Sequence, residues 1–510
     1  MDGRDGFAGS WQVASVVHGA QGQQAAARDL LARLTALRAE VAHRAARRMA
    51  DWAPRIERAE FLLSAENLAD WLALREADLT GLQAPLAQFG LSTLGRLDGH
   101  VRPSLDAVIA ALTLIAGEPE AIFPDPSDIS AGAAILETRR DRLFGDRQDG
   151  PAARIMVTLP GTAATEPALI RDLAAAGTDC FRINCAHDRP DAWSAMIAAV
   201  REAGAAIGRR LPVSMDLGGP KFRIERVWNA DKLRLVAGNV FSLVLSARDV
   251  AKGRPSAELS HPALVRALHP GARVSLDDGK LWAEVQEIAG GRVDLRVVQA
   301  PEKGVKLKPE KGVNLPGTDL DVAALTDEDR AALDVVVPQA DIVAFSFVQT
   351  VEDVRDLLAA MQDRAHGMRL PAVLLKIETP RALKALPELI IEAGGKVPVG
   401  VMIARGDLAV EIGFERMSEI QEEILWLCEA AHVPVVWATQ VLEGMVKEGQ
   451  ASRAEVTDAA MGQRAECVML NKGPHVVAAV GFLRGVLARM DRHQDKKRAR
   501  LVPLHLWRVA

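Results

Sequence analysis

Residues 371–394 read PAVLLKIETPRALKALPELIIEAG, a short apolar strand that leads directly into a helix. Because side chains alternate along a strand, Lys376 and Glu378 should point to the same side. A lysine and a carboxylate at the end of a buried strand are costly unless they are paired or put to use. A solvated ion pair would also explain them, so the rest of the chain must decide between these readings.

The same strand-then-helix unit recurs along the chain. Apolar strands begin near residues 154, 179, 212, 341, 372, 399, 433 and 466, with helical patterns between them. Such alternation is typical of a parallel sheet with helical crossovers. Eight units predict an α/β fold, the TIM (β/α)8 barrel.

Two regions depart from this alternation. Residues 218–315 are rich in strands, and LDDGKL and AGGRV carry the Asp-Gly and Gly-Gly signals of tight hairpins. Near the start of the chain, Leu30, Leu34, Leu37 and Val41 recur at helical spacing. We predict an all-helical N-terminal extension (1–150), a first barrel part (151–217), an inserted small β domain (218–315), a second barrel part (316–490) and a basic tail without clear structure (491–510).

Composition limits the function. The chain has 510 residues, a net charge of −5, and four cysteines without CxxC spacing. The charge argues against a nucleic-acid partner, and the cysteines fit reduced thiols rather than disulfides or a zinc site. The sequence lacks a signal-peptide pattern and any apolar run long enough to span a bilayer. We expect a cytoplasmic protein that binds neither nucleic acid nor membrane.

Polar residues follow one predicted strand after another. In a TIM barrel, catalytic groups lie at the C-terminal ends of the strands. Any one of these residues could be a solvated loop residue or a helix cap, but six strand ends in register point to an active site. The residues are Arg182, Asn184, His187, Asp216, Lys221, Arg223, Ser346, Lys376, Glu378, Arg405, Gly406, Asp407, Thr439 and Gln440.

The chemistry of these side chains is specific. Glu378 and Asp407 offer the oxygen ligands that suit Mg²⁺ or Mn²⁺. Arg182, Arg223 and Lys376 are fixed cations that could stabilise a transferring phosphoryl group. Residues 404–407 open a helix whose free amides can hold a carboxylate. The pattern predicts an anionic substrate that carries both phosphate and carboxylate.

The motifs LLKIET, MIARGDLAVEI, WATQVLEGM, SRAEVTDAA, VSLDDGKL and EKGVNLPG resemble those of pyruvate kinase, in family order. The resemblance spans about 152 to 490. It implies that the inserted domain is a small β-barrel lid. It also implies transfer of the phosphoryl group of phosphoenolpyruvate to ADP, giving pyruvate and ATP.

The resemblance also implies residue roles. Lys376 would lie beside the transferred phosphoryl group, Arg182 would bind the phosphate, and Thr439 would belong to the relay that protonates enolpyruvate. Glu378 and Asp407 would hold Mg²⁺. The implied substrate-binding residues are Arg182, Lys376, Ala404, Arg405, Gly406 and Thr439, and the implied nucleotide-binding residues are Asn184, His187, Arg223 and Lys311.

One departure from the family pattern concerns the monovalent cation. RINCAHD puts Ala186 where the family has a serine that helps to bind K⁺, and GPKFR puts Lys221 in place of a glutamate. The monovalent-cation site, or its lysine substitute, would comprise Asn184, Asp216 and Lys221. A fixed ammonium can supply the charge of the ion. We therefore predict activity that does not require K⁺.

Other departures leave alternatives open. The turns TLPGTA (158–163) and LNKGPH (470–475) differ from the family, and Lys472 adds a cation. The resemblance covers no C-terminal regulatory domain, so we expect no activation by sugar phosphates, and the helical extension would cover apolar barrel surface or build a homo-oligomer. The alternatives are a barrel enzyme of enolate chemistry without phosphoryl transfer, or a non-catalytic sensor of phosphoenolpyruvate.

Overall fold

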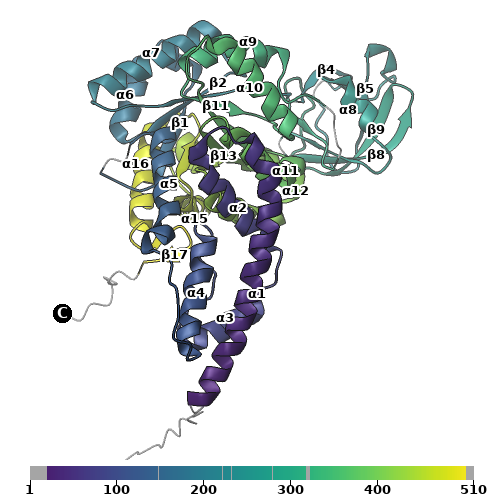
Figure 1. Cartoon of the computed structure of the whole chain (residues 1–510). Helices are drawn as coiled ribbons and strands as arrows, with labels where there is room; N and C mark the ends of the chain where they lie inside the picture. The colour runs from purple at the N-terminus through teal and green to yellow at the C-terminus, as the bar shows by residue number, and fades with distance from the viewer. Residues whose placement is uncertain are drawn as a thin grey trace, which may run out of the picture. The chain divides into compact units, whose positions relative to one another are not determined.

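In the computed structural model, the described residues are 20–146, 149–220, 222–230, 233–277, 279–317 and 322–500. They form two compact units (Figure 1). One comprises residues up to 49 together with 69–131, and the other comprises 50–68 together with 132 onward. The predicted extension of 1–150 therefore contributes two of its segments to the unit that contains the barrel.

The first unit is helical, as its apolar spacing predicts. Its described helices are α1 (Ala20–Trp52), α2 (Leu62–Arg75), α3 (Thr80–Gln88) and α4 (Val101–Ile115), with the ends of α1 and α2 extending into the second unit. Leu30 and Leu34 are buried, and Arg38 pairs with Asp106 at 2.9 Å. No helix among the described residues combines the length and apolarity needed to cross a bilayer.

Eight parallel strands close into a barrel in the second unit, which confirms the predicted TIM fold. Each begins within two residues of its predicted start. Around the barrel the strands neighbour one another in the order β1-β15-β14-β13-β12-β11-β3-β2. They are β1 (Arg154–Thr158), β2 (Cys180–Asn184), β3 (Val213–Asp216), β11 (Ile342–Phe345), β12 (Ala372–Ile377), β13 (Val399–Ala404), β14 (Val435–Ala438) and β15 (Cys467–Leu470).

Helices follow the strands and form the outer layer (Figure 1). Thr326 and Thr350 each begin a helix with a capping box, in which the side chain accepts the backbone N–H of an aspartate three residues on. The helices are α6 (Pro167–Ala176), α7 (Pro190–Ala206), α9 (Asp327–Gln339), α10 (Val351–Ala365), α11 (Pro380–Gly394), α12 (Arg405–Ile412), α13 (Met417–Ala430), α14 (Glu443–Glu448), α15 (Arg453–Met461) and α16 (Val476–Met490).

The amino-terminal end of the barrel is closed by α5 (Pro126–Phe144). Leu143 and Phe144, at the end of this helix, belong to the same buried cluster as interior strand residues such as Met402. A Cβ atom at Gly400, near the start of β13, would lie 2.9 Å from Leu143 Cδ2. The last two residues of α5 are therefore part of the barrel core.

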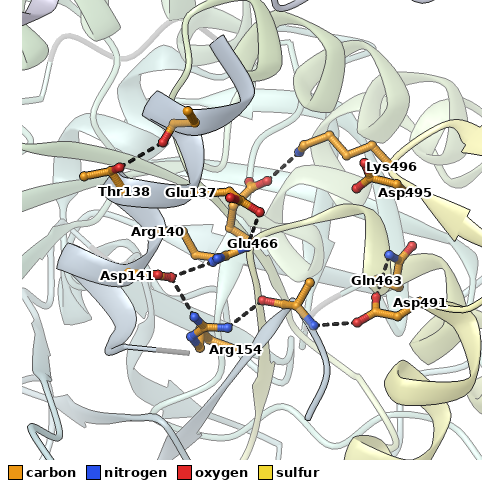
Figure 2. A network of polar contacts seen from close by, with 12 residues as sticks. Glu137, Thr138, Arg140, Asp141, Arg154, Gln463, Glu466, Asp491, Asp495 and Lys496 are labelled. Atoms are coloured by element: carbon orange, nitrogen blue, oxygen red, sulfur yellow. Dashed lines mark hydrogen bonds and ion pairs between the residues drawn. The ribbon is translucent and has the colours of Figure 1, made fainter. Parts of the chain in front are cut away.

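A polar network below the strands ties distant segments together (Figure 2). The buried Arg154 at the start of β1 donates to Asp141 at 2.6 Å and to the Gly145 carbonyl at 2.8 Å. Asp491, just after α16, accepts the Ala152 backbone N–H at 2.5 Å. These contacts join α5, the first strand and the last helix of the barrel.

The segment predicted as an unstructured basic tail is structured as far as residue 500. It contains a small hairpin of β16 (Gln494–Asp495) and β17 (Arg498–Ala499). Lys496 lies 2.5 Å from Glu466, which also accepts the Val435 N–H at 2.8 Å. Burial opposes the charge on Lys496, but Glu466 outweighs burial and raises the lysine pKa. Residues 501–510 lie outside the described part of the chain.

The inserted domain forms a nearly closed β-barrel. Its strands, in sheet order, are β10 (Val313–Asn314), β7 (Arg273–Leu276), β8 (Leu281–Ala289), β9 (Arg292–Gln299), β5 (Val240–Val244), β6 (Ser256–Leu259) and β4 (Ile224–Trp228). A bridge between Arg223 and Gly312 joins the two edges. Gly290-Gly291 makes the predicted two-residue turn between β8 and β9, with Gly290 at φ +60°. A short helix, α8 (Pro262–Ala267), was not predicted.

Candidate active site

A buried charged cluster occupies the carboxyl ends of the barrel strands. Lys376, near the end of β12, donates to Ser346 Oγ at 2.7 Å and lies 3.1 Å from Glu378 Oε1. Its Nζ is also 3.5 Å from Asp216 Oδ2, at the end of β3. Lys376 and Glu378 are thus in contact, although β12 ends at Ile377 and Glu378 lies just past the strand.

Arg182 completes this cluster from β2. Its Nη2 lies 2.7 Å from Asp216 Oδ2, and its Nη1 donates to Thr158 Oγ1 at 3.1 Å. The Asp216 contacts are ion pairs without hydrogen-bond alignment, because neither of its buried oxygens has a well-directed donor. Two cations, Arg182 and Lys376, thus face two anions, Asp216 and Glu378. The cluster is close to neutral and preorganised.

The environment sets the charge state of the central pair. Burial opposes ionisation of Lys376, but Glu378 and Asp216 outweigh it, so the pKa of Lys376 is raised and the ammonium is charged. For Glu378, burial raises the pKa, Lys376 counteracts it, and Asp407 adds to the increase. The carboxylate of Glu378 therefore carries a repulsion from Asp407 that a cation between them would relieve.

The donor set fits a magnesium ion. Glu378 Oε2 accepts the Phe347 backbone N–H at 2.6 Å, which fixes this carboxylate, and Asp407 lies in the first turn of α12. Mg²⁺ is commonly held by one or two carboxylates together with water and substrate phosphates. No group of three or more His, Cys, Asp or Glu side chains suited to a metal occurs among the described residues. Two carboxylates satisfy the requirement for a phosphate-bridged ion.

The Arg405 side chain is engaged within the protein. Its Nε donates to the Ala438 carbonyl at 2.7 Å and its Nη2 to the Thr439 carbonyl at 2.6 Å. Nη2 also lies 2.8 Å from Asp458 Oδ2, and the guanidinium lies over the Trp437 ring at 4.7 Å. The Arg405 guanidinium therefore holds the turn after β14 in place.

Gly406 and Thr439 are packed closely against each other. Thr439 has φ +69°, a left-handed conformation that is strained for a β-branched residue. A Cβ atom at Gly406 would lie 2.8 Å from Thr439 Cγ2. The start of α12 and the predicted protonation residue thus form one rigid corner, together with the N-cap Ala404.

The predicted nucleotide residues have partners of their own. In the inserted domain, Arg223 pairs with Glu310 at 2.8 Å, and Lys311 pairs with Asp277 at 2.8 Å. Asn184 Oδ1 accepts the Ala186 N–H at 3.1 Å. Among the described residues, the side chains of Asn184, Arg223 and Lys311 form no hydrogen bond or ion pair with the side chains of the Lys376 cluster.

His187 links the nucleotide residues electrostatically to the altered turn LNKGPH. Burial lowers the pKa of His187, and the neighbouring cations Lys472, Arg223 and Arg182 lower it further. The cationic residues from three segments therefore act on the same imidazole. Lys472 of the altered turn is therefore close enough to act on His187.

Lys221 lies outside the described residues, but the turn before it is well defined. Asp329 accepts the Gly218 N–H at 2.7 Å and the Gly219 N–H at 3.1 Å, while it also closes the capping box of α9. Asp329 was not among the predicted site residues. The signal for it was present, because Thr326 and Asp329 have the spacing of a capping box.

Comparison with known proteins agrees with this geometry. Residues 151–475 match the family "Pyruvate kinase, barrel domain". The chain is 35% identical over 346 residues to a pyruvate kinase of Methylorubrum extorquens, covering 66% of this chain and 68% of that protein. It is 32% identical over 349 residues to a pyruvate kinase of Agrobacterium vitis (67% and 70%) and 31% identical over 336 residues to that of Thermotoga maritima (64% and 68%). The chain belongs to the pyruvate kinase family and is a pyruvate kinase-like enzyme.

Proposed function

We propose that the protein transfers the phosphoryl group of phosphoenolpyruvate to ADP and so produces pyruvate and ATP. The observation that carries this proposal is the buried contact of Lys376 with Glu378 and Asp216, beside Arg182. Preorganised cations in a water-poor site stabilise the charge that moves during phosphoryl transfer. Family membership supports the same reaction.

The residues divide the work by position. Arg182 and Lys376 bind the phosphate, and the charged Lys376 stays close enough to stabilise the enolate oxygen. Thr439 takes part in the relay that protonates enolpyruvate. Glu378 and Asp407 hold Mg²⁺, which supplies neutralisation of phosphate charge when bound. Arg223 and Lys311 bring nucleotide contacts from the inserted domain, whose closure excludes water from the transfer.

We also propose that K⁺ is not required. Lys221 and Ala186 support this proposal. Ala186 lacks the hydroxyl that would bind K⁺, and the ammonium of Lys221 would supply the charge of the ion. Asp216 also has two fixed cationic partners, Arg182 and Lys376, on one side of that site. A homo-oligomer remains a further prediction, to be checked by sedimentation equilibrium.

The deciding experiment measures pyruvate formation from phosphoenolpyruvate and ADP with Mg²⁺, with K⁺ and with Na⁺ alone. We expect turnover in both salts, and its loss in Lys376→Met, while Lys252→Met in the inserted domain serves as a control with the same charge change. Binding of phosphoenolpyruvate without pyruvate formation under any nucleoside diphosphate would overturn the kinase proposal. That result would favour a sensor or an enolate enzyme without phosphoryl transfer.

A further inference from the structure

A cavity lies in the barrel unit, at the opposite end of the strands from Lys376. Its volume is about 320 Å³. It is lined by residues of the segment before α2 (Arg58, Glu60 and Phe61), by the second half of α5 and by Pro398-Val399. Val399 is the first residue of β13, whereas the proposed metal ligand Asp407 follows the last residue of that strand. The cavity is therefore separate from the active site, although both contact the same strand.

The cavity has an excess of positive charge. Arg58, Arg139 and Arg142 line it, against Glu60 as the one carboxylate among its lining residues. The Glu60 side chain is 61% exposed, and its Oε1 contacts Arg58 and lies 3.5 Å from Arg142. The exposed Glu60 carboxylate thus pairs with two of the three guanidinium groups.

Arg139 lacks a carboxylate partner among the described residues. Its guanidinium donates to the His432 carbonyl at 2.9 Å and to the Glu60 backbone carbonyl at 3.1 Å, which are neutral acceptors. Burial, and then repulsion from Arg58, lowers the pKa of Arg139 to about 10, and Glu60 offsets only part of this decrease. A partly buried cation with so little compensating charge is costly, and a bound anion would reduce that cost.

Apart from Thr138, the rest of the cavity wall is apolar. Phe61, Ile135, Leu143 and Val399 contribute to it, and Arg139 lies over the Phe61 ring at 5.0 Å. The volume falls within the range of small-molecule sites, which combine apolar walls with a few fixed polar groups. Guanidinium groups suit carboxylate and phosphate because they donate in pairs.

We propose that this cavity binds a small organic anion, with a carboxylate or phosphate group facing Arg139 and Arg142 and an apolar body against Phe61 and Ile135. Both the cationic and the apolar part of the wall are needed to specify this ligand. Inorganic phosphate would leave the apolar wall uncovered, and a neutral apolar compound would leave Arg139 without an anion in direct contact.

The site is placed to act on the barrel strands. Arg58 donates to the Val397 carbonyl at 2.6 Å, just before β13, and Arg139 donates to the His432 carbonyl, shortly before β14. These strands lead to Asp407 and Thr439. A bound anion would compete with the Val397 and His432 carbonyls for these arginines. It would thereby alter the hydrogen bonds that hold the starts of β13 and β14. This effect on turnover rests on the proposed function, whereas ligand binding does not.

Calorimetric titration of the full chain tests the binding, with 2-naphthoate, 1-naphthyl phosphate and the neutral 2-naphthamide as probes. We expect at least one of the two anions to bind at a single site, and 2-naphthamide to bind about tenfold more weakly or worse, since charge-assisted contacts are lost. The tighter of the two anions identifies carboxylate or phosphate as the preferred group. Lys376→Met should bind the anion as wild type does, which separates this cavity from the active site.

Two variants locate the site. Arg142→Glu reverses a half-exposed charge and should weaken anion binding about tenfold or more, while Arg171→Glu on α6 makes the same charge change at an exposed position and should have no effect. Ile135→Trp should fill the cavity and abolish binding. Failure of both anions to bind wild type at millimolar concentration, or equal binding by Arg142→Glu, would overturn the proposal. Neither result depends on phosphoryl transfer.

Discussion

Arg182 Nη2 lies 2.7 Å from Asp216 Oδ2, and that same oxygen lies 3.5 Å from Lys376 Nζ. One buried carboxylate therefore serves two buried cations that come from different strands. Both cations are already removed from water in the substrate-free protein. A substrate phosphate can therefore bind to them without a further cost of desolvating them. Asp216 thus compensates the two positive charges and stabilises the cluster when substrate is absent.

Replacing Asp216 tests this role. Asp216→Ala leaves Arg182 and Lys376 partly uncompensated, and we expect the free energy of unfolding to fall by about 3 kcal/mol or more. Urea denaturation of the substrate-free protein measures the change. Asp179→Ala is the matched control, because Asp179 also pairs with an arginine, Arg209 at 2.7 Å, but lies outside the cluster. Added phosphate should restore stability to the Asp216 variant only; no restoration would contradict the proposed substitution of one anion by another.

Glu411 makes a pH-dependent contribution to stability. Burial raises its pKa to about 7, a hydrogen bond to Asn314 opposes the shift, and Asp407 adds to it. A raised folded-state pKa means that stability is fully present below the unfolded pKa, near 4.5, and is lost as pH rises through about 7. In wild type, the free energy of unfolding should decline by up to about 3 kcal/mol between these two pH values, and Glu411→Gln should remove this decline. Parallel pH profiles of unfolding for wild type and Glu411→Gln would show the pKa assignment to be wrong.

Position 221 is expected to decide the monovalent-cation requirement. In Lys221→Glu the ammonium is lost and a carboxylate is gained, so turnover should fall in Na⁺ and recover when K⁺ is added. Steady-state rates in the two salts at equal ionic strength measure this. Lys221→Gln removes the ammonium without adding a ligand for K⁺. Its turnover should therefore fall and should not recover when K⁺ is added. If Lys221→Glu is equally active in both salts, Lys221 does not replace the ion.

The contact between Gly406 and Thr439 predicts a non-additive pair of substitutions. In Gly406→Ala the new methyl would meet Thr439 Cγ2 at 2.8 Å, so Thr439 must move and kcat should fall by about tenfold or more. Thr439→Ser removes Cγ2 but keeps the hydroxyl. The double variant should therefore be more active than Gly406→Ala alone. Additive losses in the double-mutant cycle would mean that the steric contact does not control Thr439.

The barrel could be predicted from sequence because each strand is a short apolar run that ends in polar residues. The run AVLLKI predicts both β12 and the position of Lys376, and the alternation rule places Glu378 beside it. Periodicity reports local structure and which face is buried. It therefore found all eight strands within two residues of their starts.

Features that depend on distant partners could not be predicted in this way. Leu143 and Phe144 look like the end of an ordinary amphipathic helix until the barrel interior that they fill is known. Lys496 looks like part of a basic tail because its partner, Glu466, is a single residue in a distant segment. Arg405 was expected to serve the substrate, and only the positions of Asp458 and the Ala438 carbonyl show what its guanidinium contacts.

The network around Asp491 and Arg154 has a consequence for the order of folding. The barrel closes where β1 pairs with β15, a contact between segments at opposite ends of the fold and one that carries a large loop-closure entropy. Asp491 holds the approach to β1 from a position beyond α16, so this contact forms only after the last helix has left the ribosome. Until the segment that carries Asp491 has been made, the contact between β1 and β15 therefore lacks this support.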